Sequence, residues 1–195
     1  MELTKTSMKK KLDKLFIQGK ILKSDAKAIA VVGSREITQR GYKLTKIFVS
    51  ALSKSGFTIV SGLARGVDTV AHKTALAAGG RTIAVLGSGL DIIYPPENKK
   101  LAQEIIGRGA LVSPFPFGTK PYPENFLARN RVIANFSLAV LVIEGERRSG
   151  TLSTASWAAN QGIDVFAIPG SEATDWLIGQ GAIAVNKPRD ILNEL

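Results

Sequence analysis

Short loops rich in glycine, serine and arginine follow apolar runs in this sequence, and they hold the residues best suited to binding an anion. The clearest is Ser61-Gly62-Leu63-Ala64-Arg65-Gly66, where an arginine lies between two glycines directly after the apolar run FTIV. Glycine lets the backbone approach a ligand closely, and the arginine guanidinium offers a planar set of donors that matches phosphate oxygens. The loops span residues 33–35, 61–66, 87–91, 144–151 and 169–171. We therefore expect them to share a phosphate-binding site.

Each loop taken alone has a plainer interpretation, in which glycine makes a tight turn and Arg65 pairs with Asp68 or Asp91. Several such loops at one edge favour phosphate binding instead. The usual nucleotide motifs are absent from the sequence, because it contains no GxxxxGK[ST], and the GxG that begins at Gly87 lacks the third glycine of a dinucleotide site.

Residues suited to catalysis are few. Asp68 and His72 are four residues apart and can form a base with an orienting acid, but a helix-end carboxylate beside a structural histidine is the more typical arrangement. Asp91 and Glu144 each end an apolar run, and we expect them to orient nearby arginines. No catalytic residue is predicted, and the protein is not expected to be an enzyme.

The segment FLARNRVIANF, residues 126–136, adds two further arginines to the candidate site. Because Arg129 and Arg131 are two residues apart on a predicted helix, they cannot both face the same crevice. Phe126 and the nearby Tyr122 can stack on unpaired bases or pack in the core.

Apolar runs that alternate with helical patterns are the elements that must position these residues. The pattern predicts βαβ units and a mostly parallel sheet, and continuous apolarity indicates that helices cover both faces of that sheet. Right-handed crossovers then bring the carboxyl ends of all parallel strands to one edge. The predicted strands are 28–33, 57–62, 81–87, 110–115, 138–145, 163–170 and 182–185. The predicted helices are 38–56, 66–80, 96–109, 126–136, 149–162, 175–181 and a short one from residue 188.

Composition excludes several classes of protein. The absence of cysteine and the presence of one histidine exclude disulfides, thiolate metal sites and multi-histidine metal sites, and indicate a cytoplasmic protein. No apolar run is long enough to span a membrane. The formal net charge of +10 favours a polyanionic partner such as nucleic acid.

Half of that charge lies at the N-terminus, where residues 1–27 hold eight lysines against three acidic residues. The spacing of Leu12, Leu15, Phe16 and Ile21 predicts a short amphipathic helix there. We expect a basic N-terminal segment over residues 1–27 and a main domain over residues 28–195.

Several stretches together resemble the DNA-processing protein A family, also called Smf, of bacteria. They are AVVGSR (30–35), SGLARGVDTVAH (61–72), VLGSGLDIIYPPEN (85–98), FLARNRVIANFS (126–137), LVIEGERRSGTLSTASWAANQG (141–162), VFAIPG (165–170) and LIGQGA (177–182). The chain departs from the family pattern at Pro114, where a glutamate usually follows the serine.

The resemblance implies a doubly wound, three-layer α/β/α domain of the extended Rossmann-like type. It also implies sequence-nonspecific binding of single-stranded DNA in a basic pocket, dimerisation, and help in loading the RecA recombinase during natural transformation and recombination. No cofactor is implied. On this resemblance the DNA-binding residues are Gly33, Ser34, Arg35, Gly62, Arg65, Gly66, Phe126, Arg129, Asn130, Arg131, Ser149, Gly150 and Thr151.

Two other functions remain open. One is a nucleotide-binding enzyme similar to the lysine-decarboxylase-like phosphoribohydrolases, whose PGGxGTxxE motif carries a glutamate that the stretch from Ser149 to Thr154 lacks. The other is a nucleotide-sensing module in which the pocket holds one free nucleotide.

Overall fold

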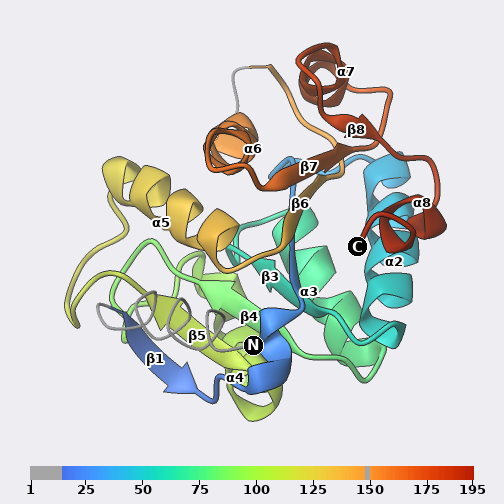
Figure 1. The fold of residues 1–195 in the computed structure, drawn as a ribbon. Coiled ribbons are helices and arrows are strands. Elements are labelled where there is room, and N and C mark those ends of the chain that lie inside the picture. Colours follow the sequence, from blue (N-terminus) through green and yellow to red (C-terminus); the bar gives the residue numbers. More distant parts are fainter. Residues whose placement is uncertain (1–14, 148–149) are drawn as a thin grey trace.

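The computed structural model describes residues 15–147 and 150–195 (Figure 1). Within these residues eight strands form one sheet in the order β1-β5-β4-β3-β2-β6-β7-β8. Strand β1 is antiparallel to β5, and the other neighbouring pairs are parallel. The strands are β1 (Phe16–Gly19), β2 (Ala28–Val32), β3 (Thr58–Ser61), β4 (Thr82–Val85), β5 (Ala110–Ser113), β6 (Ala139–Val142), β7 (Asp164–Ala167) and β8 (Ile183–Ala184).

Helices connect the parallel strands, as the alternation in the sequence predicts. They are α2 (Gln39–Lys54), α3 (Val67–Ala77), α4 (Lys99–Arg108), α5 (Pro123–Asn135), α6 (Gly150–Asn160), α7 (Glu172–Gly179) and α8 (Pro188–Leu192), with 3-10 helices η1 (Lys23–Ala26) and η2 (Pro96–Asn98). The predicted α/β class with a mostly parallel sheet is confirmed.

The sheet is buried on both faces, which explains the continuous apolar runs of its strands. Successive residues of a strand point to opposite faces. Val32 packs with Ile133 of α5 and Ala155 of α6, whereas Val31 packs with Phe48 of α2 on the other face. Figure 1 shows α5 and α6 on one side of the sheet and α2 and α3 on the other. Phe48 has no exposed surface, and burial of such a side chain stabilises the fold by about 1.5–3 kcal/mol.

The strand order reverses next to β2. From β2 the chain moves outward through β3, β4 and β5, then returns to place β6 on the other side of β2. In open α/β sheets the crevice for a ligand lies outside the carboxyl ends of the strands at this switch point. The loops after β2 and β6 therefore border the expected site.

The predicted helix near the N-terminus is wrong for residues 16–19, which form β1 instead. Phe16 pairs with Ser113 and Gly19 with Ala110, so this segment extends the same sheet as the main domain. All of its residues are exposed, so no apolar periodicity marks it as a strand. The part of the prediction that concerns residues 1–14 lies outside the described residues.

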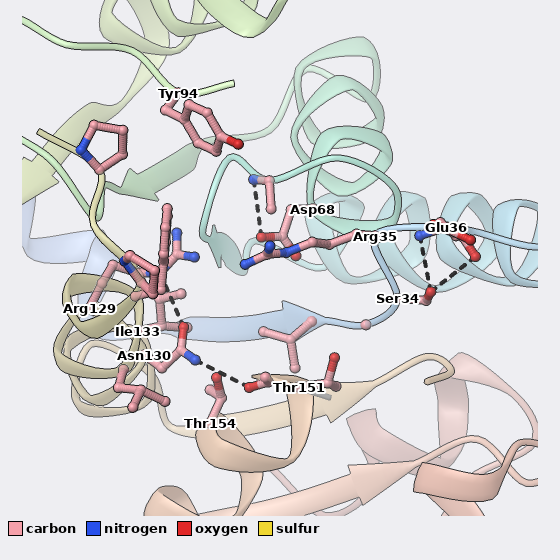
Figure 2. A pocket seen from close by; sticks show the side chains of 18 of the residues that line it. Ser34, Arg35, Glu36, Asp68, Tyr94, Arg129, Asn130, Ile133, Thr151 and Thr154 are labelled. Carbon is pink, nitrogen blue, oxygen red and sulfur yellow. Dashed lines mark hydrogen bonds between the residues drawn. The ribbon is translucent and has the colours of Figure 1, made fainter. Parts of the chain in front are cut away.

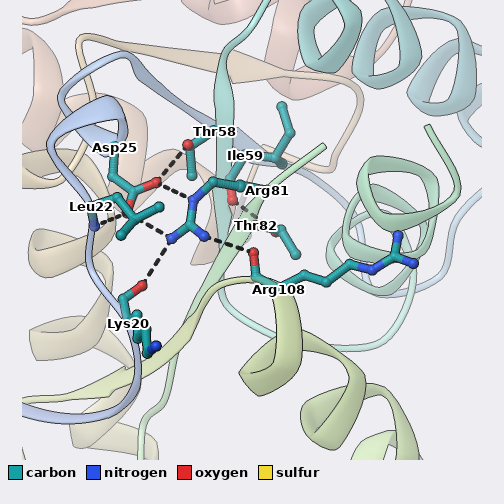
Figure 3. Close-up of polar contacts among 8 residues, drawn as sticks. All are labelled: Lys20, Leu22, Asp25, Thr58, Ile59, Arg81, Thr82 and Arg108. Carbon is teal, nitrogen blue, oxygen red and sulfur yellow. Dashed lines mark hydrogen bonds and ion pairs between the residues drawn. The ribbon is translucent and has the colours of Figure 1, made fainter. Parts of the chain in front are cut away.

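A buried ion pair holds this segment against β4 (Figure 3). Arg81 donates from Nε to Asp25 Oδ1 over 2.9 Å and from Nη2 to the Lys20 carbonyl over 2.8 Å. Thr58 Oγ1 donates to the same carboxylate over 2.8 Å. Burial acts to raise the pKa of Asp25, but hydrogen bonds from Arg81, the Leu22 N–H and Thr58 outweigh it, and the pKa lies below its usual value.

None of the helices in the described residues has the length and apolar character that crossing a membrane requires.

Candidate functional site

A cavity of about 620 Å³ lies at the switch point, where the loop after β2 meets α5 and the start of α6 (Figure 2). Of the five loops that the sequence predicts to share one site, those at residues 33–35, 61–66 and 144–151 contribute to its lining, whereas those at 87–91 and 169–171 do not. Its lining includes Val32, Gly33, Ser34, Arg35, Glu36, Ala64, Asp68, Tyr94, Phe126, Leu127, Arg129, Asn130, Ile133, Glu146, Gly150, Thr151 and Thr154.

The loop Gly33-Ser34-Arg35 is held firmly at the mouth of the cavity. The Ser34 N–H donates to the Glu144 carbonyl over 3.0 Å, and the Ser34 carbonyl accepts from the Val67 N–H over 3.0 Å. A side chain at Gly66, which has a φ of +70°, would overlap the backbone of Ser34 and Arg35, so only glycine permits this contact. The backbone around Arg35 is thus fixed on both sides.

The Arg35 side chain is exposed, and it forms no ion pair with any residue in the described part of the chain. Its guanidinium carbon lies 5.4 Å from the centroid of the Phe126 ring, a cation–π contact. The donors of Arg35 are therefore positioned over an aromatic ring and remain available to an anion.

Arg129 is only 4% exposed and has a different role. Its Nη1 donates to the carbonyl oxygens of Gly62 and Val85, the latter over 2.8 Å, and its Nε donates to Asn130 Oδ1 over 3.1 Å. Its guanidinium carbon also lies 5.5 Å from the centroid of the Phe126 ring. A side chain at Gly62 would overlap this guanidinium. Arg129 therefore ties α5 to the ends of β3 and β4.

Burial lowers the pKa of Arg129 to about 10, against the opposing effect of the Asp68 carboxylate, so the group stays charged at neutral pH. Burial raises the pKa of Asp68, against the opposing charge of Arg129. Asp68 accepts hydrogen bonds from the Gly62 N–H over 3.1 Å and the Ala64 N–H over 3.3 Å. Arg129 and Asp68 thus give the floor of the cavity two opposite buried charges.

His72 does not form a catalytic base with Asp68. It is fully buried, and its Nδ1 lies 2.7 Å from Thr82 Oγ1. Since Thr82 donates its hydroxyl proton to the Ile59 carbonyl, Nδ1 must carry the imidazole proton. The structural interpretation of His72 is confirmed.

Asn130 connects α5 to the start of α6. Its Nδ2 donates to the Gly150 carbonyl over 3.1 Å and to Ser153 Oγ over 2.7 Å. The first N–H groups of a helix have no partner within the helix and attract anions. Gly150 and Thr151 begin α6 in the lining of the cavity, and the first turn contains no acidic residue. Ser149 lies outside the described residues.

The starts of α2 and α3 are used within the protein. Thr38 Oγ1 accepts from the Gly41 N–H over 2.9 Å at the start of α2, and the Val67 N–H at the start of α3 binds Ser34. These two helix starts therefore have fewer N–H groups to offer a ligand. The start of α6 is the better anion site.

Two predicted arginines lie outside the cavity. Arg65 is exposed and donates from Nε to Glu97 Oε1 over 2.6 Å, so the expected partners Asp68 and Asp91 are wrong. Arg131 lies over the Trp157 ring, 4.6 Å from its centroid. The expectation that both join a common pocket wall is not met, and contact with DNA at the rim stays a prediction for each.

The expectation that Asp91 and Glu144 orient arginines is wrong. Asp91 accepts from the Gly118 N–H over 3.0 Å, and Glu144 accepts from the Thr38 N–H over 2.7 Å and from Thr38 Oγ1 over 2.6 Å. Both carboxylates fix loops.

Sequence reasoning missed Tyr94, whose ring lies 6.0 Å from that of Phe126 in the cavity lining. The signal was available, because Tyr94 follows β4 at the same sheet edge as the other loops. Tyr122, the alternative aromatic candidate, is 52% exposed and does not line the cavity. Three carboxyl groups, those of Glu36, Asp68 and Glu146, also line the cavity, so its wall is not uniformly basic.

The fold and the site define a class of protein. Strands β4-β3-β2-β6-β7 have the order of a doubly wound, Rossmann-like sheet, and the cavity at the switch point combines an available guanidinium, a helix start and two aromatic rings. This is a Rossmann-like protein with a cavity suited to a phosphate that carries an aromatic base.

The family follows from comparison with known proteins. Residues 3–195 match the model of the DNA recombination-mediator protein A family, and the chain belongs to that family. It is 46% identical to Protein Smf of Escherichia coli over 188 residues, which cover 93% of this chain and 50% of that protein. The chain thus spans about half the length of that relative.

Two solved structures are similar over the same 93% of the chain. DNA processing protein A from Streptococcus pneumoniae superimposes with a TM-score of 0.86 at 42% identity, and the superposition covers 66% of that protein's chain. DNA processing protein A from Helicobacter pylori superimposes with a TM-score of 0.85 at 31% identity, and the superposition covers 86% of that protein's chain. Its structure is reported for a unique single-stranded DNA binding mode.

Proposed function

We propose that this chain binds single-stranded DNA without sequence preference, with the cavity at the switch point holding a backbone phosphate and an adjacent base. The observation that carries the proposal is the Arg35 guanidinium, available beside the start of α6 in a fold whose Helicobacter pylori relative binds single-stranded DNA. Backbone phosphates supply most of the affinity in such binding.

Each part of the cavity has a role in the proposal. Arg35 and the first N–H groups of α6 bind one phosphate, as charge-assisted donors do elsewhere. Phe126 and Tyr94 offer ring surface on which a base can stack. Arg129 contacts the Phe126 ring, and Asn130 fixes α5 relative to α6.

A double strand is a poor fit for the same cavity. Stacking on Phe126 or Tyr94 requires a base with a free face, which a duplex does not offer without unstacking. Preference for the single strand therefore follows from the aromatic pair rather than from the arginines.

We further propose the cellular role that the family suggests: the chain protects single-stranded DNA in the cytoplasm, acts in natural transformation and recombination, and helps load RecA as a homodimer. The description of the family as a recombination mediator and the names of the relatives support this role. No catalytic step is part of the proposal, and no cofactor is required.

Fluorescence anisotropy with a labelled thymidine oligonucleotide and a matched duplex tests the proposal. Wild type is expected to prefer the single strand, and Arg35→Ala should lower that affinity by about tenfold to a hundredfold, since it removes charged hydrogen bonds. Lys100→Ala is the matched control, because Lys100 is an exposed cation on α4 and does not line the cavity. Arg65→Ala and Arg131→Ala decide whether the rim also contributes.

Equal affinity of wild type and Arg35→Ala for the oligonucleotide would contradict the proposal. Tight binding of adenosine monophosphate, or release of its base, with no affinity for oligonucleotides would favour the phosphoribohydrolase-like or nucleotide-sensing alternative.

A further inference from the structure

A second groove, of about 750 Å³, lies between α2 and α3 and has no part in the proposed DNA site. We call it the α2/α3 groove. Tyr42 and Ile47 of α2 line it and are 45% and 55% exposed, so the groove presents apolar side chains to solvent beside its polar residues. The small residues Ala51 and Ala78 also line it, and they leave room for a partner to approach both helices closely.

The charges around the groove are all of one sign. Lys46, Lys54 and Lys73 line it, and no carboxyl group does. Helix α2 contains no acidic residue, and the one acidic residue of α3, Asp68, is buried in the wall of the DNA cavity. Among the described residues, neither ion pair involves these three lysines.

We propose that the α2/α3 groove is a docking site for an acidic, amphipathic segment of a partner protein. Apolar side chains of that segment would cover Ile47 and Tyr42, and its carboxylates would pair with the three lysines. A shallow trough between two helices is a common receptor for such a segment, read through apolar side chains three or four residues apart. Complementary charge then selects acidic partners over basic ones.

The groove is poorly equipped for DNA, the other polyanion that three lysines can attract. It contains no arginine, and its wall is helix, so backbone N–H groups there are used within α2 and α3. Its one aromatic ring, Tyr42, already has Lys46 Nζ 5.4 Å from its centroid. The apolar part of the groove therefore offers more to a peptide than to a sugar–phosphate chain.

The position of the groove allows a partner and DNA to bind together. The starts of both helices are near the DNA cavity, since Asp68 of α3 lines it and α2 begins three residues after Glu36 of the lining. Figure 1 shows α2 and α3 together on one face of the sheet. A segment in the groove would lie on that face and leave the cavity open.

Selection from a library of short random peptides displayed on phage tests the proposal. The whole chain is the bait, and Ile47→Glu is the counter-selected variant. Enriched peptides are expected to carry a net negative charge with apolar residues at helical spacing. A synthetic copy of the best peptide should bind Ile47→Glu at least about tenfold more weakly than wild type, as loss of a central apolar contact does in other interfaces.

Charge reversal provides the matched control. Lys54→Glu and Lys73→Glu should weaken the peptide complex, whereas Lys100→Glu, an exposed lysine on α4, should leave it unchanged. Circular dichroism checks that each variant folds, and the oligonucleotide affinity of Lys54→Glu and Lys73→Glu should equal that of Lys100→Glu, which has the same net charge.

Three results would overturn the proposal. They are the absence of enriched peptides, enrichment of peptides without acidic residues, and equal binding of the selected peptide by wild type and Ile47→Glu. A larger loss of oligonucleotide affinity in Lys54→Glu or Lys73→Glu than in Lys100→Glu would also overturn it and assign the groove to DNA.

Discussion

At the residue scale, the surroundings of two arginines separate a ligand-binding role from a structural one. Arg35 is exposed and makes no ion pair with a described residue. Arg129 is 4% exposed and donates hydrogen bonds to Gly62, Val85 and Asn130. Both guanidinium groups contact the same ring, Phe126. An anion bound by Arg35 would also relieve the repulsion that Arg35 exerts on Arg129. The pair is thus arranged to favour an anion at the cavity mouth.

His72 provides a residue-scale prediction about stability. Burial lowers its pKa to about 3, compared with 6.5 in an unfolded chain, so the unfolded chain takes up a proton first as the pH falls. The free energy of unfolding should therefore decrease from pH 6.5 downward, and the contribution of His72 should amount to about 2 kcal/mol at pH 5.

Urea unfolding at pH 7 and pH 5, followed by tryptophan fluorescence, measures this effect in wild type and in His72→Gln. The difference between the two proteins isolates His72, because the raised pKa of Asp68 changes stability in the opposite direction as the pH falls. If both proteins lose the same free energy between pH 7 and pH 5, the account of His72 is wrong.

At the scale of elements, the N-terminal segment is attached by the pairing of β1 with β5, by the ion pair of Asp25 with Arg81, and by Leu15 and Ile21, which pack on the core. Strand β1 contributes no buried side chain, so its place beside β5 depends on backbone hydrogen bonds and on Arg81, which links Lys20 and Asp25 to β4 (Figure 3). Asp25 has no exposed side-chain surface, and a quarter of the Arg81 side chain is exposed.

Arg81→Ala should therefore leave a buried carboxylate without its charge partner. The free energy of unfolding is expected to fall by about 3 kcal/mol, at the lower end of the usual range because Arg81 is partly exposed. In Arg81→Ala the amide hydrogen exchange of residues 16–19 should become faster than in wild type, and this increase should be larger than the increase in β2. Adding Asp25→Asn should recover part of the loss, and no recovery would contradict the charge explanation.

The elements that the sequence predicts well are those whose own residues supply the driving force. Strands such as β2 are apolar throughout, and the helices carry one apolar side each, so periodicity reveals them. β1 has no such signal, since pairing with β5 and the Arg81 contact come from residues far away in the sequence. Leu15 and Ile21 have helical spacing there but pack on the core from the residues that flank β1 on either side.

The site likewise contains residues whose positions the sequence predicts and residues whose positions depend on distant parts of the chain. The motif around Gly33-Ser34-Arg35 and the helix with Phe126 and Arg129 are predicted from sequence, because sheet topology alone brings them together. The position of the Arg65 side chain is not predicted from sequence, because its partner Glu97 lies in η2, far from Arg65 in the sequence. A pairing of that kind depends on loop conformation, which no local pattern specifies.

At the scale of the whole molecule, the positive charge of the chain is not concentrated in the cavity. The net charge is +10, but the cavity contains two arginines and three carboxyl groups. The surplus charge should therefore attract DNA at long range, while Arg35 and the start of α6 fix its position.

Long-range attraction combined with few phosphate contacts predicts that the DNA affinity depends moderately on salt concentration. If about three to five phosphates are neutralised, the logarithm of the association constant should fall with the logarithm of salt concentration with a slope of about −2 to −3.5. Anisotropy titrations of a thymidine oligonucleotide at several salt concentrations measure the slope. A slope near zero would show that phosphate contacts do not dominate binding.

The central claim is that the cavity at the switch point holds the DNA strand, and photo-crosslinking tests it most directly. A thymidine oligonucleotide that carries 4-thiothymidine is bound, irradiated and digested with the protein, and the crosslinked residues are identified by mass spectrometry. The account predicts crosslinks at Phe126 or Tyr94, and their loss in Arg35→Ala. Crosslinks confined to the α2/α3 groove or to β1, with none in the cavity lining, would contradict it.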